Sequence, residues 1–289
     1  MTDETTKVAA IAMYSEMGNP VANLARVEHW ARKASREGAT FGLFTEECIT
    51  GSMNKSNLTV DQIHDVALEA HELAIPFLER LSSELLMTLV VGTMEPVNKR
   101  LRNSAYIVGP DGHLATYSKL HLPGNENDWF LPGDSMQVVS SQGWTFSVGI
   151  CFDARFPEMF RAAARAGADF FLLAVGASGM GELVNSDGDQ TEQAKSYKEL
   201  NMKFLPSRAV DNGMYVIKAN QSGKSGNAWF PGLALALDPT GEVIAQHMPG
   251  EGMIVVEVSR HAIREARCSL SCTVDTARPN VYCDPTIVI

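Results

Sequence analysis

The chain carries its most informative stretch in the run Val148-Gly149-Ile150-Cys151-Phe152-Asp153-Ala154-Arg155-Phe156-Pro157-Glu158. The segment before it, Trp144–Ile150, is typical of a β-strand, and Pro157–Gly167 is typical of a helix, so the local pattern is that of an α/β fold. Cys151 is therefore expected at a strand-to-loop corner, where following backbone N–H groups stay free to hold an oxyanion. A single cysteine is more often a buried structural residue. Its interpretation as a nucleophile depends on other segments.

Two further segments place charged groups at the ends of expected strands. The first is Phe41-Gly42-Leu43-Phe44-Thr45-Glu46-Glu47-Cys48-Ile49-Thr50-Gly51, a short apolar strand that ends in a carboxylate. The second is Tyr117-Ser118-Lys119-Leu120-His121-Leu122-Pro123, a lysine at the end of a β-like run. Strand ends are where α/β enzymes gather side chains from distant parts of the chain into one crevice. The sequence thus supplies a carboxylate, an ammonium and a thiol in three such places.

Together these segments resemble the nitrilase superfamily of carbon–nitrogen hydrolases. Its members carry a Glu–Lys–Cys triad in the patterns F-P-E-x-x-x-T-G, [RS]-K-x-H-L and C-x-D-x-R-F-P-E, which correspond here to Glu46, Lys119 and Cys151. The likeness extends from about Lys7 to about Tyr282, and the shared order and spacing of the motifs make it specific.

The resemblance implies a four-layer α-β-β-α sandwich with the triad at one end of two face-to-face sheets. It also implies that Cys151 is the nucleophile, Glu46 the general base and Lys119 the cation that holds the oxyanion together with the backbone N–H of Phe152. A nearby ammonium is expected to favour the thiolate, since a free cysteine has a pKa of about 8.5. Glu126 resembles the fourth member of the family's site, a carboxylate that orients the lysine.

The chain departs from the family pattern at positions that bear on the substrate. Thr45 replaces the usual proline, and the adjacent Glu47 is a second candidate base; Glu46 is preferred because it stands four residues before Thr50. The segment Gly176–Glu182 is small and flexible where many relatives have aromatic residues. The residues expected to form the walls of the substrate pocket, from their position near the motifs, are Trp129, Phe152, Ala177 and Ser178.

The composition agrees with a single globular domain over residues 1–289. Hydrophobic residues make up 45% of the chain, and no linker or repeat divides it. The net charge of −10, from 24 basic and 34 acidic residues, argues against nucleic acid as a partner. The apolar run Phe170–Ala177 is too short to cross a membrane, and the N-terminus has no signal core. We expect a cytoplasmic protein without a membrane partner.

The five cysteines do not suggest a disulfide scaffold, because their number is odd. Cys268 and Cys272 have the i, i+4 spacing of metal ligands, but no nearby His or Cys pair completes a zinc site. The sequence therefore predicts neither a metal nor a cofactor.

Elsewhere the pattern alternates between strand and helix. Two expectations are tested below: a long helix over Thr59–Glu84, opened by Thr59, and a single helix over Thr191–Asn212.

The function predicted is hydrolysis of a small linear amide or carbamoyl compound through a Cys151 thioester, without metal. A small nitrile is the first alternative substrate, and a non-catalytic or acyl-transferring relative of the same fold is the second. We also expect at least a homodimer, built by two-fold symmetry, because the C-terminal tail, about 275–289, ends in apolar residues.

Overall fold

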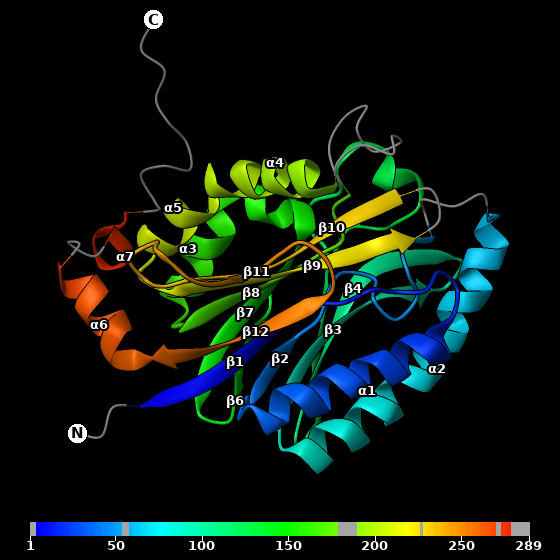
Figure 1. Ribbon diagram of the computed structural model, residues 1–289, viewed down its shortest axis with the longest axis horizontal. Helices are drawn as coiled ribbons and strands as arrows, with labels where there is room; N and C mark the ends of the chain where they lie inside the picture. The colour runs from blue at the N-terminus through cyan, green and yellow to red at the C-terminus, as the bar shows by residue number, and fades with distance from the viewer. Residues whose placement is uncertain (1–3, 54–57, 179–189, 226–227, 270–272, 279–289) are drawn as a thin grey trace, which may run out of the picture.

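Two β-sheets lie face to face at the centre of the computed structural model, which describes residues 4–53, 58–178, 190–225, 228–269 and 273–278 (Figure 1). The first sheet has the strand order β12-β1-β2-β3-β4-β5. Its strands are β1 (Thr5–Ala12), β2 (Phe41–Leu43), β3 (Thr88–Val97), β4 (Arg100–Gly109), β5 (Gly112–Ser118) and β12 (Gly252–Ser259).

The second sheet has the order β11-β10-β9-β8-β7-β6. Its strands are β6 (Val138–Ser141), β7 (Trp144–Ile150), β8 (Phe170–Val175), β9 (Tyr215–Ser225), β10 (Ala228–Leu237) and β11 (Val243–His247). In each sheet three adjacent strands run parallel, β1-β2-β3 in the first and β7-β8-β9 in the second.

Helices cover the outer faces of both sheets. In Figure 1 the pair α1 (Pro20–Arg36) and α2 (Val60–Leu85) lies outside the first sheet, and α3 (Pro157–Arg165), α4 (Gln190–Met202) and α5 (Leu205–Val210) lie outside the second. Two more, α6 (Arg260–Ser269) and α7 (Thr273–Thr276), follow β12. The expected four-layer α-β-β-α sandwich is confirmed. No helix in the described residues is long and apolar enough to cross a membrane.

Aromatic rings fill the space between the sheets. Phe41 of β2 meets Phe146 and Phe170 of the second sheet edge to face, with ring centroids 5.7 and 5.3 Å apart. Strand β8 is buried along its whole length, as expected for a parallel strand covered on both faces. This packing fixes the two sheets relative to each other and therefore brings their strand ends together.

The long helix is confirmed as α2, with Thr59 as its N-cap. The Thr59 hydroxyl accepts from the backbone N–H of Gln62, and the Gln62 side chain accepts from the backbone N–H of Thr59 in return, a reciprocal pairing that satisfies two otherwise open donors.

The prediction of one helix over Thr191–Asn212 is wrong. The segment forms α4 and α5, which are separated at Lys203 and Phe204. Pro206, in the first turn of α5, is the physical cause: proline has no N–H to donate to the preceding turn, and its ring disfavours a helical residue before it. Neither α6 nor the edge strand β6 was predicted from the sequence.

Candidate active site

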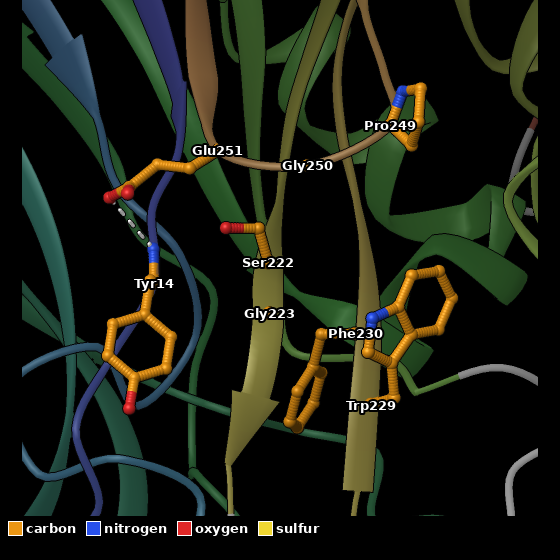
Figure 2. A pocket seen from close by; sticks show the side chains of 8 residues that line it. All are labelled: Tyr14, Ser222, Gly223, Trp229, Phe230, Pro249, Gly250 and Glu251. Carbon is orange, nitrogen blue, oxygen red and sulfur yellow. Dashed lines mark hydrogen bonds between the residues drawn. The ribbon is translucent and has the colours of Figure 1, made fainter. Parts of the chain in front are cut away.

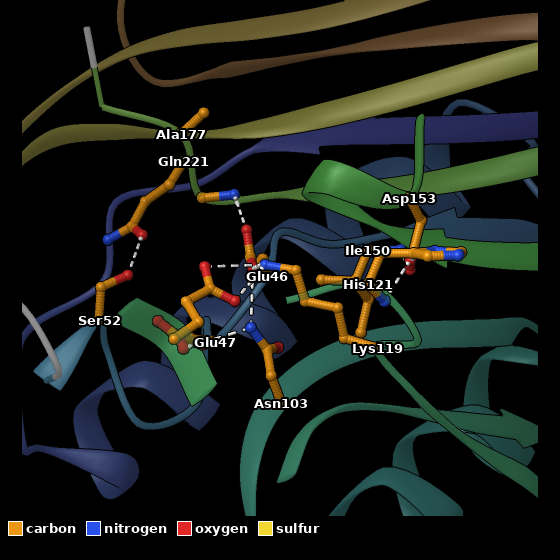
Figure 3. Close-up of polar contacts among 12 residues, drawn as sticks. Glu46, Glu47, Ser52, Asn103, Lys119, His121, Ile150, Asp153, Ala177 and Gln221 are labelled. Carbon is orange, nitrogen blue, oxygen red and sulfur yellow. Dashed lines mark hydrogen bonds and ion pairs between the residues drawn. The ribbon is translucent and has the colours of Figure 1, made fainter. Parts of the chain in front are cut away.

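Glu46 occupies the centre of a buried polar cluster between the sheets (Figure 3). Its Oε1 accepts from Lys119 Nζ at 2.8 Å and from Asn103 Nδ2 at 2.7 Å, while its Oε2 accepts from the backbone N–H of Gly176 at 2.5 Å. Only 4% of the residue is exposed. Donors from β4, β5 and the end of β8 therefore hold one carboxylate in a single orientation.

The backbone after β2 reaches this position because β3 has a glycine beside it. A Cβ on Gly92 would lie 2.3 Å from the carbonyl oxygen of Thr45 and 2.7 Å from the nitrogen of Glu47, so no larger residue fits there. Glu47 itself adopts a left-handed conformation, with φ of 51°. The Glu47 carboxylate oxygen Oε1 lies 3.4 Å from Asn103 Nδ2. Lys119 forms ion pairs with two other carboxylates, those of Glu46 and Glu126.

Lys119 follows the end of β5 and is fully buried. Its Nζ lies 2.8 Å from Glu46 Oε1 and 2.8 Å from Glu126 Oε2; Glu126 comes from a 3₁₀ turn, Gly124–Asp128. Burial lowers the pKa of the Lys119 ammonium, but the charges of Glu46, Cys151 and Glu126 oppose it and together raise this pKa well above its usual value. Lys119 therefore keeps its positive charge, and this charge acts electrostatically on Cys151.

Cys151 stands directly after β7, at the first residue of the 3₁₀ turn Cys151–Arg155. Its φ of 48° lies in the left-handed region, which is uncommon for a residue with a Cβ and is concentrated at functional sites. The residue is partly exposed and lines a cavity. The sulfur is thus presented to an open space, as the corner in the sequence predicts.

Asp153 braces this corner from within the turn. One carboxylate oxygen accepts from the backbone N–H of Ile150 at 2.9 Å and from the hydroxyl of Tyr117 at 2.6 Å. The other lies 2.8 Å from Nδ1 of His121 and accepts from its backbone N–H at 3.1 Å (Figure 3). Asp153 lies within the cysteine motif, but its bracing role was not predicted from the sequence.

The cavity beside Cys151 has a volume of about 290 Å³. Of the four expected wall residues, Phe152, Ala177 and Ser178 line it. Trp129 is not among its described lining residues; it packs against a separate apolar cluster that contains Met53 and Phe130. Of the small-residue segment Gly176–Glu182, only residues 176–178 lie within the described part of the chain.

Five contributors to the site were missed by sequence reasoning. Asn103 and the backbone of Gly176 hold Glu46, and Asn220 pins the 176–178 segment by accepting from the N–H of Ala177 at 2.9 Å. Lys218 and Tyr197 reach the cavity from β9 and α4. Asn220 alone had a signal, since the run Ala219-Asn220-Gln221-Ser222-Gly223 resembles the family's pattern at a strand exit.

A second hollow of about 290 Å³ shares no described lining residue with the first (Figure 2). One of its lining residues, Glu251, accepts from the backbone N–H of Tyr14 at 3.2 Å and from the indole of Trp30 at 3.1 Å. It holds no thiol. Within the described residues no group of three or more His, Cys, Asp or Glu side chains has the arrangement of a metal site.

Comparison with known proteins agrees with this geometry. The family model described as carbon–nitrogen hydrolase matches residues 7–268, so the chain belongs to the carbon–nitrogen hydrolase family. Among curated relatives, a nitrilase of Pyrococcus abyssi is 28% identical and covers 90% of this chain and 92% of its own. An omega-amidase of Saccharomyces cerevisiae is 26% identical to this chain, and the match covers 96% of this chain and 95% of the omega-amidase.

Solved structures of relatives share the fold and a cysteine site. The amidase NitN from Nesterenkonia sp. AN1 superimposes with a TM-score of 0.74 at 26% identity, covering 92% of this chain and 98% of that one. A mutant of the Nesterenkonia amidase, with a TM-score of 0.73, shows Michael addition of acrylamide at its active-site cysteine.

Proposed function

We propose that this chain is an amidase that hydrolyses a small linear amide or carbamoyl compound through a thioester on Cys151. The proposal rests on one arrangement: the Glu46 carboxylate and the Lys119 ammonium lie 2.8 Å apart, and the Lys119 ammonium interacts electrostatically with Cys151. Cys151 has a left-handed backbone conformation and lines a cavity. Amidases among the relatives, including an (R)-stereoselective amidase of Pseudomonas sp., support the reaction class.

In the first half-reaction the sulfur of Cys151 forms a bond to the amide carbon. Glu46 takes the thiol proton, and the carbonyl oxygen becomes an oxyanion that Lys119 and the backbone N–H of Phe152 stabilise. Removal of one such donor typically costs about 3–4 kcal/mol of barrier. The carbon–nitrogen bond then breaks, and Glu46 returns the proton to the departing nitrogen, so that ammonia or an amine leaves.

In the second half-reaction water replaces the amine. Glu46 removes a proton from water, the hydroxide adds to the thioester carbon, and the carbon–sulfur bond breaks to release the carboxylic acid and the thiol. Glu126 orients Lys119 throughout. This cycle consumes one water for each amide and needs no metal, because the charge on the oxygen is met by a fixed ammonium.

A nitrile is the alternative substrate, since a curated relative is named a nitrilase and the same thiol can attack a nitrile carbon. Purified protein is incubated with paired amide and nitrile analogues of equal carbon skeleton, while ammonia and acid are measured. Ammonia from the amide, together with an acyl adduct on Cys151 by intact mass spectrometry, is expected. Turnover of the nitrile alone would reject the amidase.

A Cys151→Ala variant tests covalent catalysis against a non-catalytic relative, with Cys48→Ala as the matched control. Cys48 is buried, and its thiol donates to the carbonyl of Gly92 at 3.4 Å. The first variant is expected to lose at least about 10³-fold in kcat and the second to remain active. Full activity in Cys151→Ala would overturn the mechanism.

We further propose that the protein is a single-domain, cytoplasmic homo-oligomer, either a homodimer or a higher assembly. None of the described cysteines, Cys48, Cys151 and Cys268, forms a disulfide, as is usual in a reducing compartment. The edge strand β11 exposes two apolar side chains, Val243 and Ile244. The C-terminal tail, which we expect at a subunit interface, also ends in apolar residues; its part beyond residue 278 lies outside the described residues. Light scattering at micromolar concentration is expected to give at least twice the mass of 31.4 kDa; a monomer would reject the oligomer.

A further inference from the structure

The cavity beside Cys151 has a strongly cationic lining. Arg155 and Lys218 line it, and no Asp or Glu is among its described lining residues. Arg155 places its guanidinium 4.6 Å from the ring centroid of Phe204 and remains exposed to solvent. Lys218, in contrast, is 2% exposed. One positive group therefore lies at the solvent-exposed part of the cavity and one is buried in its wall.

Lys218 reaches the cavity from β9, an interior strand of the second sheet. Its Nζ donates to the hydroxyl of Tyr197 at 2.8 Å and to Oδ1 of Asn201, and it lies 4.6 Å from the centroid of the Tyr197 ring. Tyr197 and Asn201 project from α4 and are themselves buried. Both partners are neutral, and none of the ion pairs recorded among the described residues includes Lys218.

A buried ammonium with only neutral partners is expensive, because it loses its hydration and gains no counter-charge. An apolar side chain is the usual occupant of a buried strand position. Burial lowers the pKa of Lys218 to about 7, with Cys151 and Glu46 raising it and Arg155 lowering it. These costs are offset when a ligand delivers a negative charge to Nζ.

We propose that Lys218 is a specificity-determining residue that binds the free carboxylate of the substrate's acyl group, so that the preferred substrates are monoamides of short dicarboxylic acids. The inference rests on the proposed amidase function and specifies its substrate. The amide carbon lies at Cys151, and the distal carboxylate lies at Lys218, with the Tyr197 hydroxyl and the Asn201 side chain beside it. No bond to Lys218 forms or breaks in the reaction.

The substrate test compares succinamate with 4-methylpentanamide, in which an isopropyl group replaces the carboxylate. Ammonia release is measured for the wild type, for Lys218→Met and for Lys203→Met, an exposed lysine just beyond α4 that loses the same charge. We expect the wild type to prefer succinamate by about 100-fold in kcat/KM, as for sites built around one polar group of the substrate. Lys218→Met is expected to abolish that preference, mainly through KM, so that kcat/KM falls far more for succinamate than for 4-methylpentanamide. Lys203→Met is expected to change neither substrate.

Two results would overturn the inference while leaving the amidase function intact. One is a wild type that hydrolyses 4-methylpentanamide as well as succinamate. The other is an equal loss on both substrates in Lys218→Met, which would assign Lys218 a purely structural role. Hydrolysis of the neutral amide by this variant also shows that it is folded.

A binding measurement separates the inference from the proposed function. Succinate is titrated calorimetrically into the wild type at pH 8 in two buffers of different ionisation enthalpy. We expect binding with uptake of nearly one proton, because the carboxylate restores the charge of a lysine that is mostly neutral at this pH, and no binding to Lys218→Met. If no amide is hydrolysed but succinate binds in this way, the amidase function fails and the anion site stands. Equal binding to both proteins would reject the site.

Discussion

Lys119 Nζ lies 2.8 Å from Glu46 Oε1, although the two residues are 73 positions apart in the sequence. A second carboxylate, Glu126, lies at the same distance from that nitrogen. A buried ammonium held by two carboxylates neither moves nor loses its proton easily. This pair fixes the positive charge on which both the thiol and the oxyanion depend.

The two adjacent glutamates are expected to differ strongly in function. Glu46→Gln removes the proton acceptor that Lys119, Asn103 and Gly176 hold in place, and we expect kcat/KM for an amide to fall by at least about 100-fold. Glu47→Gln changes a neighbouring carboxylate and is expected to lose less than about tenfold. Ammonia release by both variants checks this. A larger loss in Glu47→Gln would assign the base to Glu47.

The cysteines are expected to differ sharply in their rates of alkylation. Burial raises the pKa of the Cys48 thiol to about 12, and only thiolates react at an appreciable rate. Cys151 opens onto the cavity beside Lys119, and Cys268 is exposed. Iodoacetamide at pH 7.5 is expected to label Cys151 first and Cys48 only after unfolding, as peptide mass mapping will show. Early labelling of Cys48 in the native protein would contradict the burial.

Asp153 is expected to act as a positioning residue. Asp153→Asn replaces one acceptor oxygen with a donor, so either Ile150 N–H and Tyr117 or His121 loses its partner. We expect the free energy of unfolding to fall by at least about 2 kcal/mol and kcat to fall more than KM changes. Urea denaturation and steady-state kinetics measure both.

The matched control for Asp153 is Asp134→Asn. The Asp134 side chain is 78% exposed and pairs with Arg102 at 2.7 Å, and removal of such a surface pair changes stability by less than about 1 kcal/mol. Similar losses in the two variants would refute the bracing role of Asp153.

Stability is expected to depend on pH through Lys218. Its folded pKa of about 7 lies below the ordinary value of 10.5, so between these values the unfolded chain binds a proton that the folded protein does not. The free energy of unfolding therefore rises with pH between about 7 and 10.5, by up to about 1.4 kcal/mol for each pH unit from this group. Below pH 7 Lys218 is protonated in both the folded and the unfolded protein, so its contribution no longer changes with pH.

Lys218→Met removes this contribution. Lys218→Met is expected to have a higher free energy of unfolding than the wild type, and this difference is expected to be largest at pH 7 and to shrink toward pH 10. Urea denaturation at several pH values measures it. Lys203→Met, in which an exposed lysine is lost, is expected to show no such trend. A pH-independent difference between Lys218→Met and the wild type would show that the folded lysine keeps its ordinary pKa.

Much of the fold was predictable because it depends on local patterns. Residues 144–150 were predicted as a strand with the bounds that β7 has, and Thr59 was predicted to cap α2. Alternation, apolar runs and caps are properties of a few adjacent residues. The single helix predicted over Thr191–Asn212 was wrong because the helix is interrupted at Lys203 and Phe204, just before Pro206, and a second helix, α5, begins there.

The sequence by itself determined which reactive groups exist and that they follow strand ends, since motif order and spacing are carried by the chain. Tertiary structure alone decided what surrounds them. The hydrogen bonds of Asn103 and Gly176 to Glu46, the bracing by Asp153 and the burial of Lys218 against α4 all join segments from different elements. Such contacts arise when two sheets and their helices pack together, and strand periodicity does not encode them. In the sequence Lys218 is one residue of a strand; the packed second sheet makes it a buried cation beside the reactive thiol.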